Sequence, residues 1–238
     1  ENFVSEEEEQ LIISQLDGTD MDFATECLPW KAAIFNGKHM SKRWGVHCNL
    51  RDRRVDAAEN PLPQFIRQIL LPKLAAVSAM KGCTPNESNA IDYRRSQGHY
   101  LKDHVDDRKL SKEPIANLSL AGDCYMTFRN VKGTGHAVKV LLKRRCLQIL
   151  TGKSRYDYSH GIEHGHLSSE RRISVTMRES PLTIPKTTTT AAALQHSSSN
   201  VALSVKLPQS ITEKTAECLQ TIPGLYIFPD FITVDEEA

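Results

Sequence analysis

Residues 114–130, PIANLSLAGDCYMTFRN, contain two short runs of β-forming residues, and a turn signal at Gly122-Asp123 separates them. Further runs of the same kind lie on both sides, with turn signals such as Lys132-Gly133 between them. They are NAIDY (89–93), HAVKVLLK (136–143), RCLQILTG (145–152), YDYSHGI (156–162) and RRISVTMRE (171–179). Short strands that follow one another at this spacing are typical of a sandwich or barrel.

The composition fits one globular unit. The chain has 238 residues, of which 39% are hydrophobic and 25% are charged, and this length can bury one sizeable core. Lys and Arg number 30 against 29 Asp and Glu, which leaves a formal charge of +1. There is no whole-chain electrostatic signature of nucleic-acid binding, so any such footprint has to be local.

The cysteines and the apolar stretches bear on the compartment. Six cysteines are scattered along the chain without a C-x-x-C pair, which favours reduced thiols in the cytoplasm, the nucleus or both. No stretch approaches the ~20 consecutive apolar residues that a membrane span needs, so we expect no membrane partner.

Residues 1–182 are expected to form one domain. Ser5 and Glu8 fit a capping box at the start of an N-terminal helix. Residues 61–80 carry apolar side chains at helical spacing and predict a second helix. Residues 183–200 are rich in Thr and Ser and are predicted to be a flexible linker.

The tail, residues 201–238, resembles the start of the chain. PDFITVDEEA (229–238) aligns without gaps on ENFVSEEEEQ (1–10). GLYIFPDF (224–231) has the pattern of a strand that leads into a helix. We therefore expect the tail to repeat or to complete the strand–helix opening of the domain, with residues 224–231 supplying a strand in their own chain or in a neighbour.

The stretch KDHVDDRKL (102–110) can be a solvated charge cluster or part of a metal site. In an extended chain, residues i and i+2 project to the same side, so His104 and Asp106 share a face. One imidazole and one carboxylate suit a divalent first-row metal, and a second histidine completes a 2-His-1-carboxylate triad. His160, in the predicted strand YDYSHGI, is the candidate for that histidine.

Two arginines follow on the last predicted strand. Arg172 and Arg178 lie six residues apart and therefore face the same way. A guanidinium beside a metal-bound acid can clamp a carboxylate with two parallel hydrogen bonds. Each part alone has an ordinary explanation as a core or surface residue, but the order H-x-D, distant His and R-x5-R favours a site.

Three polar residues near these motifs have ordinary interpretations. Asp107 is predicted to be a solvated carboxylate, or one that orients a ligand or holds Arg108. His164 and His166 form a His-x-His pair on a polar loop, and we expect them to face solvent.

The pattern HVD…SH…RRISVTMR resembles the AlkB-type iron(II)/2-oxoglutarate-dependent dioxygenases, whose motif is H-x-D…H…R-x5-R. The similarity looks closest to the AlkB homologue 4 subgroup. It implies a mixed α+β fold, in which a double-stranded β-helix (jelly roll) at about 87–180 is flanked by N-terminal helices and a substrate-lid hairpin. It also implies that His104, Asp106 and His160 bind iron(II).

The resemblance further implies a set of cosubstrate residues. Arg172 would hold the distal carboxylate of 2-oxoglutarate, and Arg178 would line the pocket beside the metal. Ser174 lies between these arginines on the same face and is a further candidate to contact the cosubstrate.

One upstream motif departs from the family pattern. Many members carry N-x-Y-x-x-G before H-x-D, and here Gly98 keeps the glycine while Tyr93 and Arg95 stand at the Asn and Tyr positions. Tyr93 is carried over as a hydroxyl donor to 2-oxoglutarate. Asn89 is out of register for that role.

The hairpin at residues 30–54, with a turn at Asn36-Gly37, lies where AlkB-like proteins carry the lid over the substrate pocket. Its basic and aromatic residues predict a surface that grips phosphates and stacks on a base. The candidate substrate-binding residues are Lys38, His39, Lys42, Arg43 and Trp44. The alternative is a solvated hairpin whose tryptophan packs inward.

The resemblance implies an oxidative demethylase that uses iron(II), the cosubstrate 2-oxoglutarate and O2. It would hydroxylate an N-methyl carbon and release formaldehyde, succinate and CO2. The first substrate hypothesis is methylated nucleic acid, with N6-methyladenine as one candidate and the base flipped into the pocket. The alternatives are a methyl-lysine demethylase or hydroxylase acting on protein, and a non-enzymatic jelly-roll interaction module.

Overall fold

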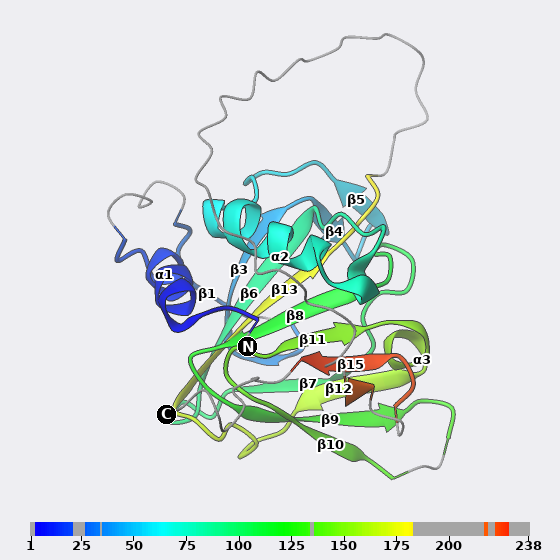
Figure 1. Ribbon diagram of the computed structural model, residues 1–238. Coiled ribbons are helices and arrows are strands. Elements are labelled where there is room, and N and C mark those ends of the chain that lie inside the picture. Colours follow the sequence, from blue (N-terminus) through cyan, green and yellow to red (C-terminus); the bar gives the residue numbers. More distant parts are fainter. Residues whose placement is uncertain are drawn as a thin grey trace, which may run out of the picture.

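Two antiparallel β-sheets face each other in the computed structural model, and helices cover the outer face of the larger sheet (Figure 1). This arrangement agrees with the predicted mixed α+β jelly roll. The structure describes residues 3–20, 27–33, 35–133, 136–182, 217–218 and 222–228. The predicted linker at 183–200 and the repeat at 229–238 lie outside the described residues.

All strand pairs in the sheets are antiparallel. The large sheet consists, in spatial order, of β1 (Lys31–Ala32), β3 (Met40–Gly45), β6 (Glu87–Arg94), β13 (Arg171–Arg178), β8 (Ile115–Leu120), β11 (Leu147–Leu150), β15 (Leu225–Phe228) and β14 (Glu217–Cys218). The small sheet consists of β10 (Val138–Leu142), β9 (Cys124–Asn130), β12 (Tyr158–Ile162), β7 (Tyr100–His104) and β2 (Gly37–Lys38). A separate pair is formed by β4 (His47–Asn49) and β5 (Arg54–Asp56). The runs predicted from the sequence are all strands, namely β6 and β8 to β13.

Strand β13 shows how the sequence builds two different faces. Its residues alternate between the two sides of the sheet, because successive side chains of a strand point in opposite directions. Ile173, Val175 and Met177 are fully buried in the apolar cluster under the helices. The even-numbered residues from Arg172 to Arg178 instead line a cavity between the sheets.

Helix α1 (Glu6–Asp17) begins as predicted. The Ser5 hydroxyl accepts a hydrogen bond from the Glu8 N–H, and the Glu8 carboxylate accepts one from the Ser5 N–H. Ile12 and Leu16 are fully buried against the large sheet, so the apolar stripe of this helix packs on the outer face of that sheet.

The predicted helix at 61–80 is divided. A π-helical turn, η2 (Ile66–Leu70), runs into α2 (Leu71–Ala75), and a 3-10 turn, η3 (Ser78–Met80), follows. Pro72 has no N–H for the usual hydrogen bond to the residue four positions earlier, which accounts for the irregular helix around it. None of the described helices is long and apolar enough to cross a membrane.

The described part of the tail belongs to the large sheet of its own chain. Strand β15 pairs with β11, and Leu147 stands opposite Phe228. Leu225 is fully buried and Ile227 nearly so, both in the apolar cluster between the sheets. Residues 225–228 therefore supply a strand within their own chain, one of the two possibilities predicted for residues 224–231.

Candidate active site

Strands β7 and β12 place two histidines side by side. His104 is the last residue of β7, and His160 lies directly opposite it in β12. The two ring centroids are 4.6 Å apart. Gly161 permits the close approach, because a Cβ there would lie 2.5 Å from the Asp103 Oδ1 and 2.8 Å from the Leu101 carbonyl oxygen.

Asp106 lies two residues beyond β7 and points its carboxylate at both histidines. Its Oδ1 is 4.0 Å from the His104 Nε2, and its Oδ2 is 3.7 Å from the His160 Nε2. One candidate ligand atom from each residue lies within 4.8 Å of the other two. This 2-His-1-carboxylate arrangement can hold a metal and leave coordination positions open. Within the described ranges, no second group of three His, Cys, Asp or Glu residues meets this distance.

The protonation states of this group also suit a metal. Burial and, to a smaller extent, the neighbouring His104 lower the pKa of His160 to about 4, although Asp106 opposes the shift, so the ring is neutral at pH 7. Burial alone would raise the pKa of Asp106, but Arg178, His160 and His104 outweigh it and hold that pKa well below its usual range. Neutral imidazole and ionised carboxylate are the forms that bind metals.

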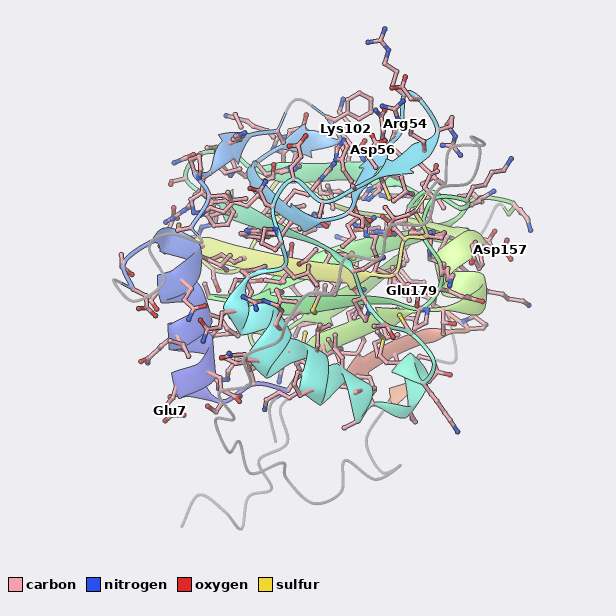
Figure 2. All side chains as sticks on the ribbon, turned by 90° about the horizontal axis from the view of Figure 1, so that it is seen from above. Glu7, Arg54, Asp56, Lys102, Asp157 and Glu179 are labelled. Carbon is pink, nitrogen blue, oxygen red and sulfur yellow. The ribbon has the colours of Figure 1, made fainter. Side chains whose placement is uncertain are left out.

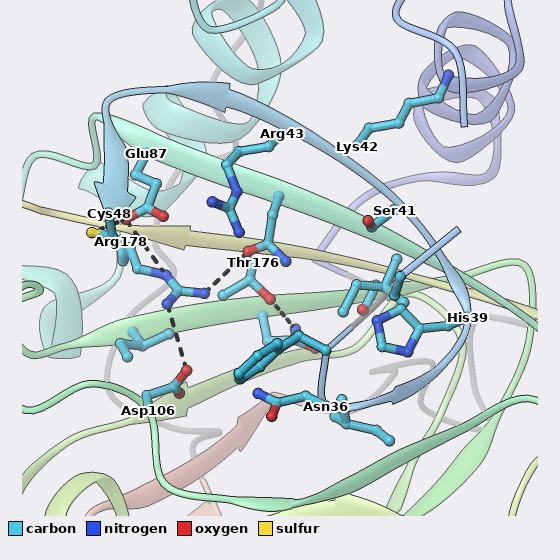
Figure 3. Close-up of a pocket in the computed structure, with 18 of the residues that line it drawn as sticks. Asn36, His39, Ser41, Lys42, Arg43, Cys48, Glu87, Asp106, Thr176 and Arg178 are labelled. Carbon is cyan, nitrogen blue, oxygen red and sulfur yellow. Dashed lines mark hydrogen bonds and ion pairs between the residues drawn. The ribbon is translucent and has the colours of Figure 1, made fainter. Parts of the chain in front are cut away.

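Arg178 connects the metal-binding group to the large sheet (Figure 3). Its Nη1 lies 3.5 Å from the Asp106 Oδ1, and its Nη2 donates to the Asn89 Oδ1 at 3.1 Å. Its Nε lies 4.0 Å from the buried Glu87 carboxylate. Glu87 also accepts hydrogen bonds from the Ser180 hydroxyl at 2.7 Å and the Cys48 thiol at 3.1 Å. Arg178 is thereby fixed between two carboxylates.

Arg172 is fully buried in the same cavity and keeps unused donors. Its Nη2 donates to the Ser119 hydroxyl at 2.8 Å, and its guanidinium carbon lies 5.5 Å from the centre of the Tyr93 ring. Its Nε and Nη1 are buried without a hydrogen-bond partner among the described residues. Unpaired buried donors are costly, and the carboxylate of a bound acid would satisfy them.

Tyr93 and Ser174 lie beside these donors. Tyr93 is almost completely buried, and both residues line the cavity. Burial raises the pKa of the Tyr93 phenol above its usual value, although Arg172 opposes the shift. The phenol therefore remains a neutral hydroxyl that can donate a hydrogen bond.

The family model of the 2OG-Fe(II) oxygenase superfamily matches residues 1–178. This chain belongs to that superfamily. The oxygenase uses iron(II), 2-oxoglutarate and O2, so the predicted enzyme class and cofactors are confirmed, and the alternative of a non-enzymatic interaction module is wrong. The triad and the unpaired donors of Arg172 fit the metal and the cosubstrate.

Curated relatives identify the oxygenase as AlkB-type. It is 30% identical over 166 residues to tRNA (carboxymethyluridine(34)-5-O)-methyltransferase ALKBH8 of Macaca fascicularis, a match that covers 68% of this chain and 23% of that protein. It is 23% identical over 209 residues to alpha-ketoglutarate-dependent dioxygenase alkB homolog 4 of Homo sapiens, a match that covers 75% of this chain and 65% of that protein. The chain thus spans less than two thirds of the length of either relative. Because both kinds match, the homologue 4 subgroup stays a prediction.

A solved structure supports the fold. The structure of OsALKBH1 superposes on this oxygenase with a TM-score of 0.56 and 18% sequence identity, covering 74% of this chain and 93% of that one. At this identity the likeness concerns the fold alone, and it confirms the predicted jelly roll.

The cavity of the oxygenase has a volume of about 720 Å³, within the range of about 300–1,000 Å³ that is usual for pockets enclosing a small molecule. Arg172 and the triad line its interior, and the segments around β1 to β4 line its mouth. Phe35 and Leu50 are 74% and 51% exposed at this mouth. Arg43 reaches over the cavity from β3 (Figure 3).

The predicted lid surface is partly wrong, because β3 is a full strand of the large sheet. Its side chains alternate, so Lys42 and Trp44 face the helices. Trp44 is buried edge-to-face against Phe65, with ring centroids 6.1 Å apart. Lys42 is buried, donates to the Leu16 carbonyl of α1 and points away from the cavity (Figure 3). Lys42 lines the cavity, but its ammonium group is directed to the Leu16 carbonyl. Trp44 is not among the lining residues and packs inward, as the alternative interpretation expected.

Of the other three lid candidates, His39 and Arg43 line the cavity, whereas Lys38 does not and donates to the Gln97 carbonyl at 2.7 Å. Lys38 and Arg43 are exposed. His39 lines the cavity but is buried, with its ring centroid 5.6 Å from that of Tyr93. The β4–β5 hairpin carries Arg54 and Asp56 on the side of the molecule away from the start of α1 (Figure 2).

The polar residues next to the motifs have structural partners. Asp107 accepts hydrogen bonds from Arg53 of the β4–β5 loop and from the Leu110 N–H. It does not hold Arg108, which donates to the Tyr156 carbonyl at 2.7 Å. His164 is exposed and stacks near Tyr100, whereas the predicted exposure of His166 is only partly met, because it is half-buried near Glu163.

The sequence interpretation missed the residues that reach the arginines from neighbouring strands. Glu87 stands directly opposite Arg178 in the pairing of β6 with β13. Ser119 stands opposite Ser174 in the pairing of β8 with β13. Only the strand register brings these residues together, and no local motif marks them.

Proposed function

We propose that this oxygenase removes N-methyl groups from nucleic acid by oxidative demethylation, with N6-methyladenine as one candidate mark. His104, Asp106 and His160 hold the iron, and Arg172 holds the distal carboxylate of 2-oxoglutarate. When bound, iron(II) with 2-oxoglutarate and O2 supplies the oxidation of the methyl C–H bond, and succinate and CO2 leave. The hydroxymethylated nitrogen then releases formaldehyde.

The residues around the metal have separate tasks in this proposal. Arg178 keeps the Asp106 carboxylate ionised and oriented toward the two histidines. Tyr93 and Ser174 offer hydroxyl groups to the cosubstrate beside Arg172. Tyr93, Arg172 and Ser174 are buried, so each of these hydrogen bonds acts in a medium of low polarity.

The mouth of the cavity is the observation that supports a nucleic-acid substrate. Phe35 presents an exposed phenyl ring there, and such a ring can stack on a base. Lys31 and Arg43 are exposed cations that line the same mouth, and cations in this position pair with phosphates. These cations give the mouth a local positive charge, although the chain as a whole is nearly neutral.

A relative gives independent support. The name of the ALKBH8 protein specifies a tRNA, and the present chain matches a part of that protein. The triad lines the interior of the cavity, so a target base has to leave its stack before its methyl group can reach the metal. An aromatic ring at the mouth suits a base that has been flipped in this way.

The decisive experiment is mass spectrometry of methylated DNA, RNA and peptide panels incubated with the protein, iron(II), 2-oxoglutarate and ascorbate. We expect an oligonucleotide to lose the mass of one methylene unit for each methyl group removed, with formaldehyde released in equal amount. Conversion of methyl-lysine peptides with no change in any oligonucleotide contradicts the proposed substrate.

Salt dependence of oligonucleotide binding is a second test. Phosphate contacts release counterions, so affinity is expected to fall steeply with salt, and Arg43→Gln is expected to reduce that slope by about one unit. Lys139→Gln, an exposed cation on β10 away from the cavity, is the matched control and should keep the wild-type slope. Equal slopes for all three proteins argue against a phosphate contact at Arg43.

A further inference from the structure

The loop that carries Asp106 lies outside both sheets. Strand β7 ends at His104, and residues 105–107 have no regular secondary structure. The carbonyl groups of Asp106 and Asp107 therefore have no neighbouring strand to bind. The position of the Asp106 carbonyl affects where the Asp106 carboxylate points, because both groups are attached to the same Cα.

Arg155 takes the place of that missing strand. It belongs to α3 (Gly152–Tyr156), and its side chain is 1% exposed. Its Nη1 donates to the Asp106 carbonyl at 2.9 Å, and its Nη2 donates to the Asp107 carbonyl. Its Nη2 also lies 3.1 Å from the Ser111 hydroxyl at the far end of the loop. One guanidinium thus binds the loop at three points.

This use of a buried cation is unusual. Arg155 makes no ion pair within 4 Å of a described carboxylate, and the Asp106 and Asp107 carboxylates attract it only at longer range. The acceptors of Arg155 are two backbone carbonyls and a hydroxyl. Binding all three requires the several N–H donors of a guanidinium, and a positive charge alone would not suffice. An apolar side chain of similar size would fill the space, but it would leave the Asp106 carbonyl without this donor and the Asp107 carbonyl with only the Ser111 hydroxyl at 3.3 Å.

Helix α3 is itself fixed, so Arg155 has a rigid base. The Thr151 hydroxyl and the Gly152 N–H donate to the Glu113 carboxylate. The Ser154 N–H donates to the Pro223 carbonyl at 2.9 Å, and the Ser154 hydroxyl donates to the Gly224 carbonyl at 2.7 Å. The contacts run from the tail through α3 to the loop of Asp106.

We infer that Arg155 is a positioning residue for the metal site, which holds the backbone of Asp106 and Asp107 so that the Asp106 carboxylate faces His104 and His160. This role rests on the proposed function, because it takes those three residues as the iron ligands. Arg155 touches neither metal nor substrate. It acts through the loop.

The test is the affinity of the full chain for Mn(II), a stand-in for iron(II) that is stable in air, measured by calorimetry. Loss of a residue that orients a metal ligand typically costs 10–100-fold in metal affinity, so Arg155→Gln is expected to raise the Mn(II) dissociation constant by about that factor. The visible absorption of bound Co(II), which reports coordination geometry, is expected to change as well. Arg155→Lys keeps the charge but lacks the fork and should give an intermediate affinity.

Arg108→Gln is the matched control. Arg108 also joins the loop to the α3 region through the Tyr156 carbonyl, but it does not touch the Asp106 backbone. We expect wild-type Mn(II) affinity from this variant. A folded Arg155→Gln protein with wild-type affinity and spectrum overturns the inference, and so does an equal loss in Arg108→Gln.

The two proposals can fail separately. His104→Ala is the reference variant, and its failure to weaken Mn(II) binding would overturn the assignment of the metal site itself. Weak binding in His104→Ala beside wild-type binding in Arg155→Gln overturns only the role of Arg155. If Arg155→Gln does not fold, Arg155→Lys decides, since a wild-type dissociation constant in that variant also contradicts the inference.

Discussion

At the scale of single residues, Arg172 stands out because it has buried hydrogen-bond donors that the described part of the chain does not satisfy. Two of its buried nitrogens lack hydrogen-bond acceptors among the described residues. Hydrogen bonds to charged groups contribute about 1.5–3 kcal/mol each, and lysine cannot reproduce the fork. We therefore expect Arg172→Lys to weaken 2-oxoglutarate binding by about 10–100-fold, as measured by titration into the Mn(II)-loaded protein.

The neighbouring arginine provides the control for this variant. Arg171 points to the opposite side of β13 and binds Asp17 and Asp92. Arg171→Lys should leave 2-oxoglutarate affinity unchanged, even if it lowers the melting temperature. Unaltered 2-oxoglutarate affinity in Arg172→Lys would contradict the proposal that Arg172 binds the distal carboxylate.

His104 is the residue whose loss should separate chemistry from folding. Its side chain is 20% exposed at the end of β7, so His104→Ala leaves the core intact but removes one of three metal ligands. We expect succinate production from 2-oxoglutarate to fall to background, while the circular dichroism spectrum stays that of the wild type. His164→Ala, an exposed histidine outside the site, should keep full activity, and a His104→Ala protein that still produces succinate would sink the assignment.

Also at the residue scale, some site residues could be predicted from the sequence and others could not, for a physical reason. His104 and Asp106 lie in one short motif and the two arginines in another, so spacing predicted that each pair shares a face. The order of the motifs favoured one common site, and the structure brings these residues together. Glu87 and Ser119 reach the arginines only through strand register. Register depends on pairings between distant segments, which one sequence does not reveal.

At the scale of elements, β3 shows how a correct strand prediction can give a wrong surface. Strand β3 carries a basic residue on each face, Lys42 on one and Arg43 on the other, so no apolar alternation marks the buried side. The burial comes from α1 and the helical segment at 64–75, which cover the outer face of the large sheet. The aliphatic stem of Lys42 crosses this interface and its ammonium group reaches the Leu16 carbonyl.

The pairing of β7 with β12 gives the second element-scale prediction. A Cβ on Gly161 would meet the Leu101 carbonyl at 2.8 Å, and backbone cannot yield without moving the strand. Overpacking of this kind costs about 1–3 kcal/mol, and it would separate His160 from His104. We expect Gly161→Ala to lower the melting temperature and to weaken Mn(II) binding.

Ser159→Ala is the matched control for this strand, because residues two apart on a strand face the same side. It removes only the hydroxyl that donates to the Arg129 carbonyl at 3.3 Å. Wild-type Mn(II) affinity is expected from it. The same affinity in Gly161→Ala would show that the close approach of β7 and β12 does not matter for the metal.

At the scale of the whole molecule, the jelly roll was predictable and its completion by the tail was less so. The number and spacing of the β-rich runs at 89–179 indicated a sandwich or barrel, and the family resemblance implied the jelly roll. The tail offered two solutions, pairing in its own chain or in a neighbour, and local pattern does not choose between them. In this structure β15 pairs with β11 of its own chain, and Leu225 fills a fully buried place between the sheets.

The position of β15 in the large sheet gives a prediction for the whole fold. A chain that ends at Asn200 loses β15, with its buried Leu225 and Ile227 and its hydrogen bonds to α3. About 1 kcal/mol shifts the melting temperature by roughly 2–4 °C in a protein of this size, so we expect a loss of at least ~5 °C by calorimetry relative to a chain that ends at Phe228. Because α3 carries Arg155, the shorter chain should also bind Mn(II) more weakly. Equal melting temperatures for the two chains would mean that β15 is not part of the stable fold.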